Sequence, residues 1–281
     1  MREVKPSLKQ RTLALCKREG LPPIHSYGQN FLINQEVLDD ILSVASLTSQ
    51  SVVIEIGSGI GVLTEKISEA SQEVYAIELD RGYARYLKKT FKNRSHVHVI
   101  NQDAIGWWET AHKDFQNGSF AVVSNLPFNI ASHVLRIFLE KTPRPSYMVL
   151  LLQKEVAERV VAPPGEMSVL SVMVQAYSDV HLECIVSRES FLPQPQVDAG
   201  LVSIKNIGWK YPGIDEDRFF KIVKAGFSAR RKKLKNNLSS IFSAKQLDIA
   251  SILSSVGASR NSRAQELTLN QWADIVKAYS I

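Results

Sequence analysis

Val52-Val53-Ile54-Glu55-Ile56-Gly57-Ser58-Gly59-Ile60-Gly61-Val62-Leu63-Thr64 is the stretch that decides the fold. Residues 52–56 are mostly apolar and β-branched, which predicts a short buried strand, and a helix is expected to begin at Val62. The glycines between them are typical of a turn whose backbone approaches a ligand closely. Their Gly-x-Gly-x-Gly spacing differs from the Gly-x-Gly-x-x-Gly that binds a dinucleotide pyrophosphate. The stretch predicts an α/β sheet with a nucleotide-type ligand at its edge.

Carboxylates occupy the tips of the next two expected strands. The strand after the turn ends in Glu78, 21 residues after Gly57, which suits an acceptor for ribose hydroxyls. The strand at residues 97–100 leads to Asp103, which is placed to accept from an adenine amine. Glu55, directly before the turn, would be unfavourable beside a pyrophosphate. It suits a ligand with ammonium and sulfonium groups, as S-adenosylmethionine has, or it serves the turn itself.

Asn125-Leu126-Pro127-Phe128 follows a fourth apolar run, at the end where ligands bind in such sheets. Asn125 offers a side-chain carbonyl, and Leu126, fixed before a proline, offers a backbone carbonyl. These two acceptors could hold the protons of an exocyclic amine, while the Phe128 ring stacks on its base. An ordinary turn is the alternative, because Asn and Pro are common turn residues. With the other strand tips, the tetrapeptide predicts an S-adenosylmethionine-dependent amine methyltransferase.

Length and composition set broad bounds. The chain has 281 residues, of which 44% are hydrophobic, enough for one large and one small domain. No apolar stretch is long enough for a membrane span, and the charged start lacks the pattern of a signal peptide. Cys16 and Cys184 are far apart and form no metal-binding spacing. We expect a cytoplasmic protein with free thiols, no metal and no membrane partner.

Positive charge is concentrated at the two flanks. The net charge is +6, yet residues 20–204 sum to −6, whereas residues 1–19 carry +4 and residues 205–245 carry +8. The densest run is Arg230-Arg231-Lys232-Lys233. Such a run is often only a solvated helix face. Beside a methyltransferase, we interpret it as a surface that binds nucleic-acid phosphates.

The alternation of expected strands and helices between Ser51 and Leu152 predicts a doubly wound, Rossmann-like α/β sheet. Further strands are expected at residues 147–152, 180–186 and 201–204. We divide the chain into a basic N-terminal extension (1–24), a methyltransferase domain (25–206) and a small all-helical, RNA-binding domain (207–281).

Helix-start signals mark the remaining elements. Helices are expected at residues 6–19, closed by Gly20, and at residues 35–47. Two capping boxes, Ser243-x-x-Gln246 and Thr268-x-x-Gln271, are each expected to open a helix in the C-terminal domain.

With these residues assembled, the chain resembles the small-subunit ribosomal RNA adenine dimethyltransferases, whose loss gives kasugamycin resistance. The resemblance covers nearly the whole length, with the motifs in the family's order. They are Tyr27-Gly28-Gln29-Asn30-Phe31-Leu32, Glu55 to Gly61, Glu78-Leu79-Asp80, Asp103-Ala104, Asn125 to Ile130, Phe191-x-Pro193-x-Pro195-x-Val197-Asp198, Phe227-Ser228-x-Arg230-Arg231-Lys232 and Arg263 to Leu267.

The resemblance implies a reaction and a set of site residues. The family dimethylates N6 of two adjacent adenosines in a hairpin loop near the 3′ end of 16S rRNA, in a precursor of the small (30S) subunit. The residues expected around S-adenosylmethionine are Asn30, Leu32, Gly57, Gly59, Glu78, Asp103 and Asn125. Those expected to face the substrate are Asn125, Leu126, Phe128, a second stacking wall at Phe191, and Arg230, Arg231, Lys232 and Lys233. We expect a monomer.

Three positions depart from the family's usual pattern. Ser58 stands where proline is common, Phe128 where tyrosine is common, and His25-Ser26 where basic residues are common. Two other functions remain open. One is an antibiotic-resistance enzyme of the same fold that methylates an adenine of large-subunit rRNA. The other is a ribosome-assembly or transcription factor in which catalysis is secondary, although the cofactor residues that such proteins tend to lose are present here.

Overall fold

The computed structural model describes residues 6–22 and 29–280, and the chain forms two compact units. The sheet unit takes Met1–Ala157 and His181–Ile207, and the helical unit takes Glu158–Val180 and Gly208–Ile281. The organisation inferred from sequence differs in two respects, because it set residues 1–24 apart as an extension and placed residues 158–180 with the sheet. Tyr177 explains the second difference: its ring stacks on Phe220 at 5.7 Å, inside the helical unit.

The sheet unit is built on seven strands in the order β4-β3-β2-β5-β6-β9-β7. Four pairings, from β4 to β6, are parallel, and β9 runs antiparallel to β6. The strands are β2 (Val52–Ile56), β3 (Glu73–Ile77), β4 (Val97–Ile100), β5 (Ala121–Asn125), β6 (Tyr147–Gln153), β7 (Asp179–Val186) and β9 (Ala199–Lys205). The predicted doubly wound sheet is confirmed, with strand ends within two residues of those expected.

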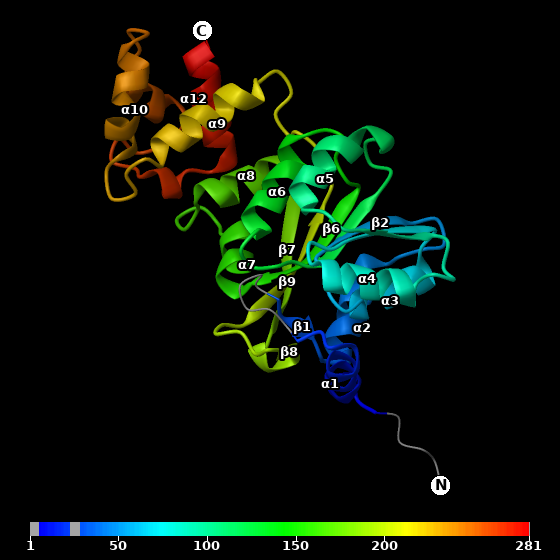
Figure 1. Ribbon diagram of the computed structural model, residues 1–281. Helices are drawn as coiled ribbons and strands as arrows, with labels where there is room; N and C mark the ends of the chain where they lie inside the picture. Colours follow the sequence, from blue (N-terminus) through cyan, green and yellow to red (C-terminus); the bar gives the residue numbers. More distant parts are fainter. Residues whose placement is uncertain (1–5, 23–28, 281) are drawn as a thin grey trace. The chain divides into compact units, whose positions relative to one another are not determined.

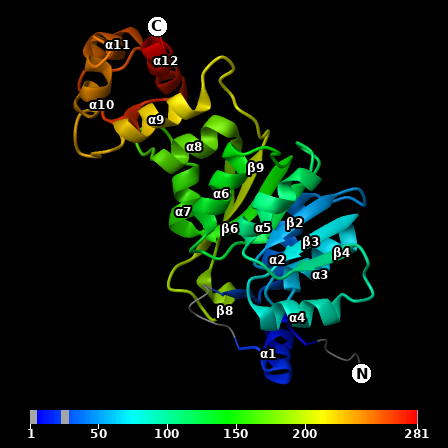
Figure 2. The ribbon, with the colours of Figure 1, turned by 45° about the horizontal axis from the view of Figure 1, so that its top comes forward.

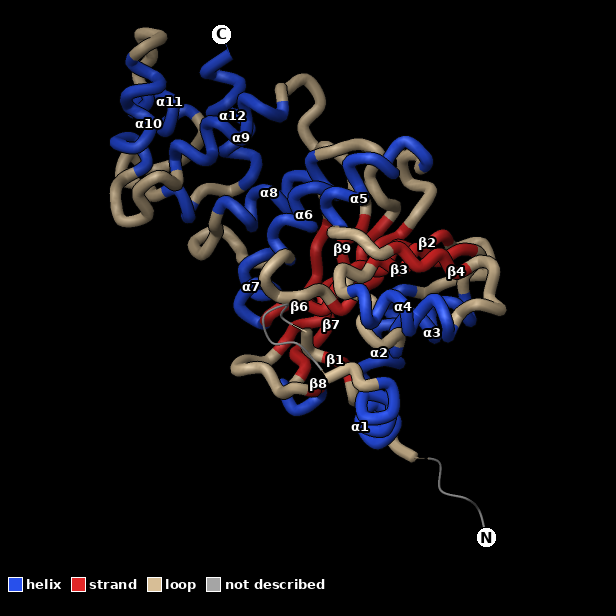
Figure 3. The backbone as a smooth tube through the Cα atoms, in the orientation of Figure 1, coloured by secondary structure: helices blue, strands red, loops and turns tan. Residues whose placement is uncertain are grey.

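Helices cover both faces of this sheet (Figure 3). One face carries α2 (Gln35–Ala45), α3 (Val62–Ala70) and α4 (Arg81–Thr90), whose apolar residues share a core cluster with the strands. The other carries α5 (Ala104–Ala111) and α6 (Ala131–Glu140). There the Trp108 ring lies 5.3 Å from Phe120 and 4.7 Å from Phe138. Burial on both faces explains why the central strands are almost continuously apolar.

The N-terminal helix α1 (Leu8–Glu19) packs beside α4 (Figure 2). It begins after Ser7, which caps it, and ends at Gly20, whose φ is +65°. Beyond α1, the Tyr83 hydroxyl of α4 donates to the carbonyl of Pro22 at 2.7 Å. Residues 1–5 and 23–28 lie outside the described residues, and with them His25-Ser26 and the first two residues of the Tyr27 motif.

Phe31–Leu32 forms the short strand β1, which was not among the expected strands. It pairs with β8 (Phe191–Leu192) in a separate two-stranded ladder, with Phe31 opposite Leu192 and Leu32 opposite Phe191. The short helices η2 (His112–Asp114) and η3 (Arg188–Ser190) complete the sheet unit, and α7 (Lys154–Val160) crosses from one unit to the other.

The helical unit contains α8 (Val169–Tyr177), α9 (Glu216–Gly226), α10 (Leu234–Ser243), α11 (Ile249–Ser255), η4 (Ala264–Glu266) and α12 (Leu269–Ser280) (Figure 1). The capping box at Thr268 is confirmed, because Thr268 and Gln271 exchange side-chain to backbone hydrogen bonds. The box at Ser243 is wrong: Ser243 ends α10. Asp248 opens the next helix instead, since its carboxylate accepts from the Ala250 N–H at 2.9 Å.

Candidate active site

A pocket opens at the carboxyl ends of the parallel strands, next to β2. In the sheet, β3 lies on one side of β2 and β5 lies on the other, so the strand order reverses at this point. This reversal of strand order is where open α/β sheets bind ligands. The empty volume, including the open mouth, is about 1030 Å³. The pocket is formed within the sheet unit by the β1 segment, the glycine turn, the tips of β3 and β4, and the loop after β5.

The glycine turn is held against β3 and against the loop after β5. The Gly57 N–H donates to the Ile77 carbonyl at 2.8 Å. Gly57 has a φ of +74°, and a Cβ there would lie 2.9 Å from two ring carbons of Pro127. Gly59 has a φ of +53°, and a Cβ there would lie 3.0 Å from the Phe31 ring. Glycine is therefore required at both positions by conformation and by contact.

Glu78 bridges two turns at the pocket floor. One carboxylate oxygen accepts from the Gly59 N–H at 2.7 Å, and the other accepts from the Asp80 N–H at 2.9 Å. The side chain is 4% exposed, and burial raises the pKa of its carboxyl, with the two N–H donors opposing the rise. Each oxygen has a second lone pair, so ribose hydroxyls could still donate to it.

Glu55 lies beneath the glycine turn and is 2% exposed. Its carboxylate accepts from the Thr64 hydroxyl at 2.5 Å. Burial raises the pKa of Glu55 to about 8; the hydroxyls of Thr64 and Ser58 lower it in part, and the charge of Glu78 adds to the rise. Glu55 thus lies under the turn and also lines the pocket, while its contact with a ligand stays a prediction.

As pH rises, the free energy of unfolding of the Glu55→Gln variant is expected to increase relative to that of the wild type. The folded state holds the Glu55 proton up to about pH 8, whereas the unfolded chain releases it near 4.5. Wild-type stability therefore falls between these values, relative to the variant, by up to about 1.4 kcal/mol per pH unit. Urea unfolding of both proteins at pH 5, 6.5 and 8 measures the difference, and parallel pH profiles would contradict the assignment.

Asn125 ends β5 and faces the pocket beside Leu126 and Phe128. Its side-chain amide donates to the Asn30 carbonyl at 2.9 Å, which turns its own carbonyl oxygen away from Asn30. Among the described residues no group donates to the Leu126 carbonyl. The Leu126 N–H donates to the Leu151 carbonyl at 3.2 Å. The Phe128 ring is half-buried against the core. The two expected acceptors and the expected ring are therefore adjacent.

Asp103 is exposed at the tip of β4, and one of its carboxylate oxygens caps α5 by accepting from the N–H groups of Ile105 and Gly106, each at 3.0 Å. Asn30 and Leu32 also line the pocket. All seven residues expected around the cofactor thus line one pocket. The structure brings them together, while their contacts with a ligand stay predictions.

Phe191 and the basic run lie elsewhere. Phe191 is 2% exposed and belongs to the core cluster, so the structure does not offer its ring as a wall of the pocket. It pairs with Leu32 across the β1–β8 ladder, which makes it a support for that wall. Arg230-Arg231-Lys232-Lys233 forms an exposed loop between α9 and α10 of the helical unit. The run is therefore not the solvated helix face that was considered for it.

Several lining residues were missed from the sequence. Leu79 is 52% exposed at the pocket edge, and Phe31, Gln102 and Ile130 also line it. Leu79 and Gln102 are direct neighbours of Glu78 and Asp103. The strand-tip pattern would have found them if it had been extended by one residue.

The lining has a distinctive charge. Three carboxyl groups line the pocket (Glu55, Glu78 and Asp103), and none of its described lining residues is Lys, Arg or His. A ligand with phosphates would find no cation among these residues, and the ionised carboxylates would repel it. A ligand with a cationic centre and hydroxyl donors fits them, as S-adenosylmethionine does. The fold and this pocket define a Rossmann-like methyltransferase.

Comparison with known proteins places the chain in a family. The family described as ribosomal RNA adenine dimethylase matches residues 24–280. A ribosomal RNA small subunit methyltransferase A of Dehalococcoides mccartyi is 34% identical over 278 residues, 98% of this chain and 94% of that protein. The same-named protein of Halothermothrix orenii is 38% identical over 274 residues, 93% and 90% of the two chains. The chain belongs to the ribosomal RNA adenine dimethylase family, as its motifs suggest.

Solved structures agree on the fold. A dimethyladenosine transferase from Plasmodium falciparum matches with a TM-score of 0.74 at 24% identity, covering 89% of this chain and 97% of that one. The 23S rRNA methyltransferase ErmE matches with a TM-score of 0.71 at 22% identity, covering 90% and 100%. Both similarities concern the architecture alone.

None of the helices in residues 6–22 and 29–280 combines the length and apolar character needed to cross a bilayer. Within the same residues, no three His, Cys, Asp or Glu side chains gather in a way that could hold a metal ion.

Proposed function

We propose that the protein dimethylates N6 of two adjacent adenosines near the 3′ end of 16S rRNA, in a precursor of the small ribosomal subunit, with S-adenosylmethionine as methyl donor. The observation that carries the proposal is the placement of Asn125, whose carbonyl oxygen is turned away from Asn30 beside the Leu126 carbonyl and the Phe128 ring. Membership of the ribosomal RNA adenine dimethylase family supports the substrate class.

The carboxylate-lined half of the pocket would hold the cofactor, which supplies an electrophilic methyl group on a sulfonium. Glu78 would accept from the ribose hydroxyls, since both of its oxygens are fixed by backbone N–H groups. Asp103 would accept from the adenine amine of the cofactor with the oxygen that does not cap α5. Leu79 would cover an apolar face of the ligand at the pocket edge.

The Asn125 half would hold the target base. In the first transfer, the Asn125 side-chain carbonyl and the Leu126 backbone carbonyl would accept from the two protons of N6, which keeps its lone pair out of conjugation with the ring. Each transfer releases one N6 proton to solvent, and in the second transfer one proton remains to be held. Phe128 would stack on the adenine, which must leave its own stack at a cost of a few kcal/mol. Because Asn125 is tied to Asn30, this acceptor is oriented before substrate binds, which is the main way such polar groups lower a barrier.

The rest of the substrate would bind through phosphates. The four cations of Arg230-Arg231-Lys232-Lys233 are exposed on a loop, where they can contact an RNA backbone. Lys233 also donates to the Asn261 side chain at 2.9 Å, which fixes one end of the loop. We propose that the protein acts on the particle as a monomer.

Incubation of the protein and labelled S-adenosylmethionine with small and large ribosomal subunits that lack these modifications tests the proposal. Label is expected in small subunits, and mass spectrometry of the digested 16S rRNA is expected to give dimethyladenosine at two adjacent positions. Label confined to 23S rRNA would replace the proposal with the large-subunit activity. Cofactor binding in calorimetry without any methyl transfer would favour the non-catalytic assembly factor.

A further inference from the structure

Helix α4 carries a cationic stripe that the proposed function does not use. Residues 81–94 contain six Lys or Arg and no Asp or Glu, within a region of the chain that is acidic overall. Arg81, Arg85 and Lys88 are exposed at the spacing i, i+4, i+7, so they share one face of α4, and the exposed Lys92 follows in the next turn. The stripe is defined here as these four residues.

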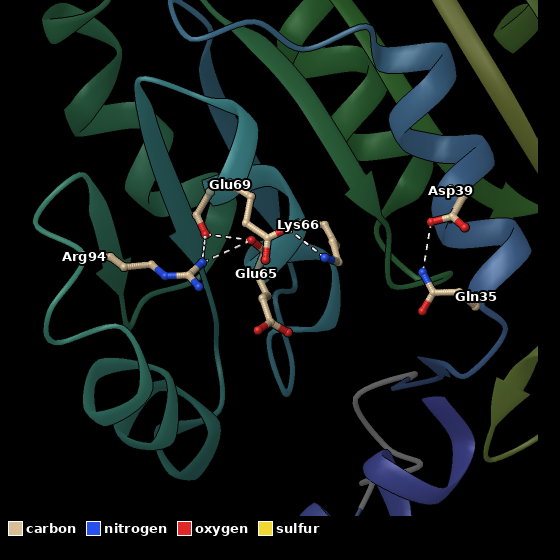
Figure 4. A network of polar contacts seen from close by, with 7 residues as sticks. Gln35, Asp39, Glu65, Lys66, Glu69 and Arg94 are labelled. Carbon is tan, nitrogen blue, oxygen red and sulfur yellow. Dashed lines mark hydrogen bonds and ion pairs between the residues drawn. The ribbon is translucent and has the colours of Figure 1, made fainter. Parts of the chain in front are cut away.

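Within residues 6–22 and 29–280, the four side chains of the stripe have no charged partner. No ion pair involves them in the described part of the chain. Their two cationic neighbours differ in this respect. Lys89 lies 3.7 Å from the Glu19 carboxylate of α1. Arg94 donates to the Glu65 carbonyl and the Ser68 hydroxyl of α3 (Figure 4).

Helix stability does not explain the whole stripe. Cations in the last turn, such as Lys88, interact favourably with the helix macrodipole. Arg81 is the first residue of α4, where the same dipole disfavours a cation. Arg85 lies in the middle, where the dipole has little effect. The helix dipole therefore does not account for the cations at Arg81 and Arg85.

The stripe begins at the rim of the pocket. Leu79 lines the pocket, Asp80 caps α4, and Arg81 follows directly. The ten residues of α4 carry the stripe away from this rim over about 15 Å. Helix α1 packs beside α4 (Figure 2), with Leu15 and Cys16 against Tyr83 near the start of α4. It adds the exposed Lys17 and Arg18. The pocket and the stripe belong to the same compact unit.

We propose that this stripe is a second RNA-binding surface, which holds the phosphate backbone next to the adenosine that enters the pocket. The inference rests on the proposed function for its partner, an RNA strand. It adds a contact on the unit that carries the pocket, separate from the basic loop of the helical unit. A row of fixed cations leading to the rim would limit how far the target nucleotide can move once the particle is bound.

Neutralising three members of the stripe tests the inference. In the Arg85→Gln, Lys88→Gln, Lys92→Gln variant, binding of unmodified small subunits is measured over a KCl series. Loss of three phosphate contacts is expected to make the negative slope of log K against log salt shallower by about 2. It is also expected to lower the affinity at 0.1 M salt by roughly 100-fold. Cofactor affinity in calorimetry is expected to stay at the wild-type value, since none of the three residues lines the pocket.

A matched variant removes the same number of cationic side chains elsewhere in the sheet unit: Lys66→Gln, Lys113→Gln, Lys141→Gln. Its slope is expected to equal that of the wild type. If the wild type methylates small subunits and both variants have its slope, the stripe is not an RNA-binding surface, although the proposed function stands. Equal losses in both variants would also overturn the stripe, because the effect would then reflect net charge. A wild type that neither binds nor methylates small subunits would overturn the proposed function and the stripe together.

Discussion

Asn125→Ala is expected to lower methyl transfer to unmodified small subunits by on the order of 10²- to 10³-fold, the usual effect of removing one preorganised polar group. The variant loses one of the two acceptors that would hold the N6 protons, and Leu126 alone cannot fix both. It also removes the hydrogen bond that the Asn125 amide donates to the Asn30 carbonyl at 2.9 Å in the wild type. Single-turnover transfer of labelled methyl groups measures the effect on the chemical step.

Two measurements separate the acceptor from the tie to Asn30. Cofactor affinity reports on the pocket wall, and we expect only a small change because the carboxylates are untouched. Asn125→Asp keeps an acceptor oxygen but loses the amide donor. A rate for Asn125→Asp as low as that of Asn125→Ala would indicate that orientation dominates. Transfer by Asn125→Ala within twofold of wild type would show that Asn125 is not an acceptor in the reaction.

Gly57→Ala is expected to destabilise the protein by about 2–4 kcal/mol and to abolish measurable cofactor binding. The substitution places a methyl group at a φ of +74°, where it meets the Pro127 ring at 2.9 Å. Relief requires the glycine turn and the Asn125 loop to move apart. Because the turn and the loop both line the pocket, the added methyl group is expected to displace the lining of the cofactor half and of the base half.

Gly118→Ala provides the control for this prediction. Gly118 has the same φ of +74°, and a Cβ there meets nothing within 4 Å. It therefore reports the backbone cost alone, about 1–2 kcal/mol. Thermal and urea unfolding of both variants give the difference that belongs to the Pro127 contact. Equal losses of stability, with cofactor binding retained in both, would show that this contact does not shape the pocket.

Much of the sheet unit could be predicted because its signals are local. A buried parallel strand needs a short apolar run, and the carboxyl ends of neighbouring strands meet at one edge. Gly57, Glu78, Asp103 and Asn125 each follow such a run, so their gathering in one pocket was predictable. The pKa of Glu55 was not, because it depends on how deeply the turn is buried.

Other errors come from contacts between distant segments. The sequence shows Phe191 as an aromatic residue in a proline-rich loop, but its burial depends on pairing with Leu32, 159 positions earlier. The box at Ser243 satisfies the local pattern. In the structure, Ser243 instead ends α10, which buries Leu234, Leu238 and Phe242 at a spacing of four residues. Local rules weigh neither kind of contact.

The discontinuity of the helical unit limits how the protein can be dissected. A chain cut at residue 206 would retain α8 but lose α9 and α12, which it contacts. The apolar side chains of α8, including Met173 and Tyr177, would lose the partners that bury them. Such a truncation would be an aggregation-prone fragment and not an isolated catalytic domain. For the same reason, exchange of C-terminal tails between relatives cannot transfer the helical unit whole, since one of its helices is encoded in the middle of the chain.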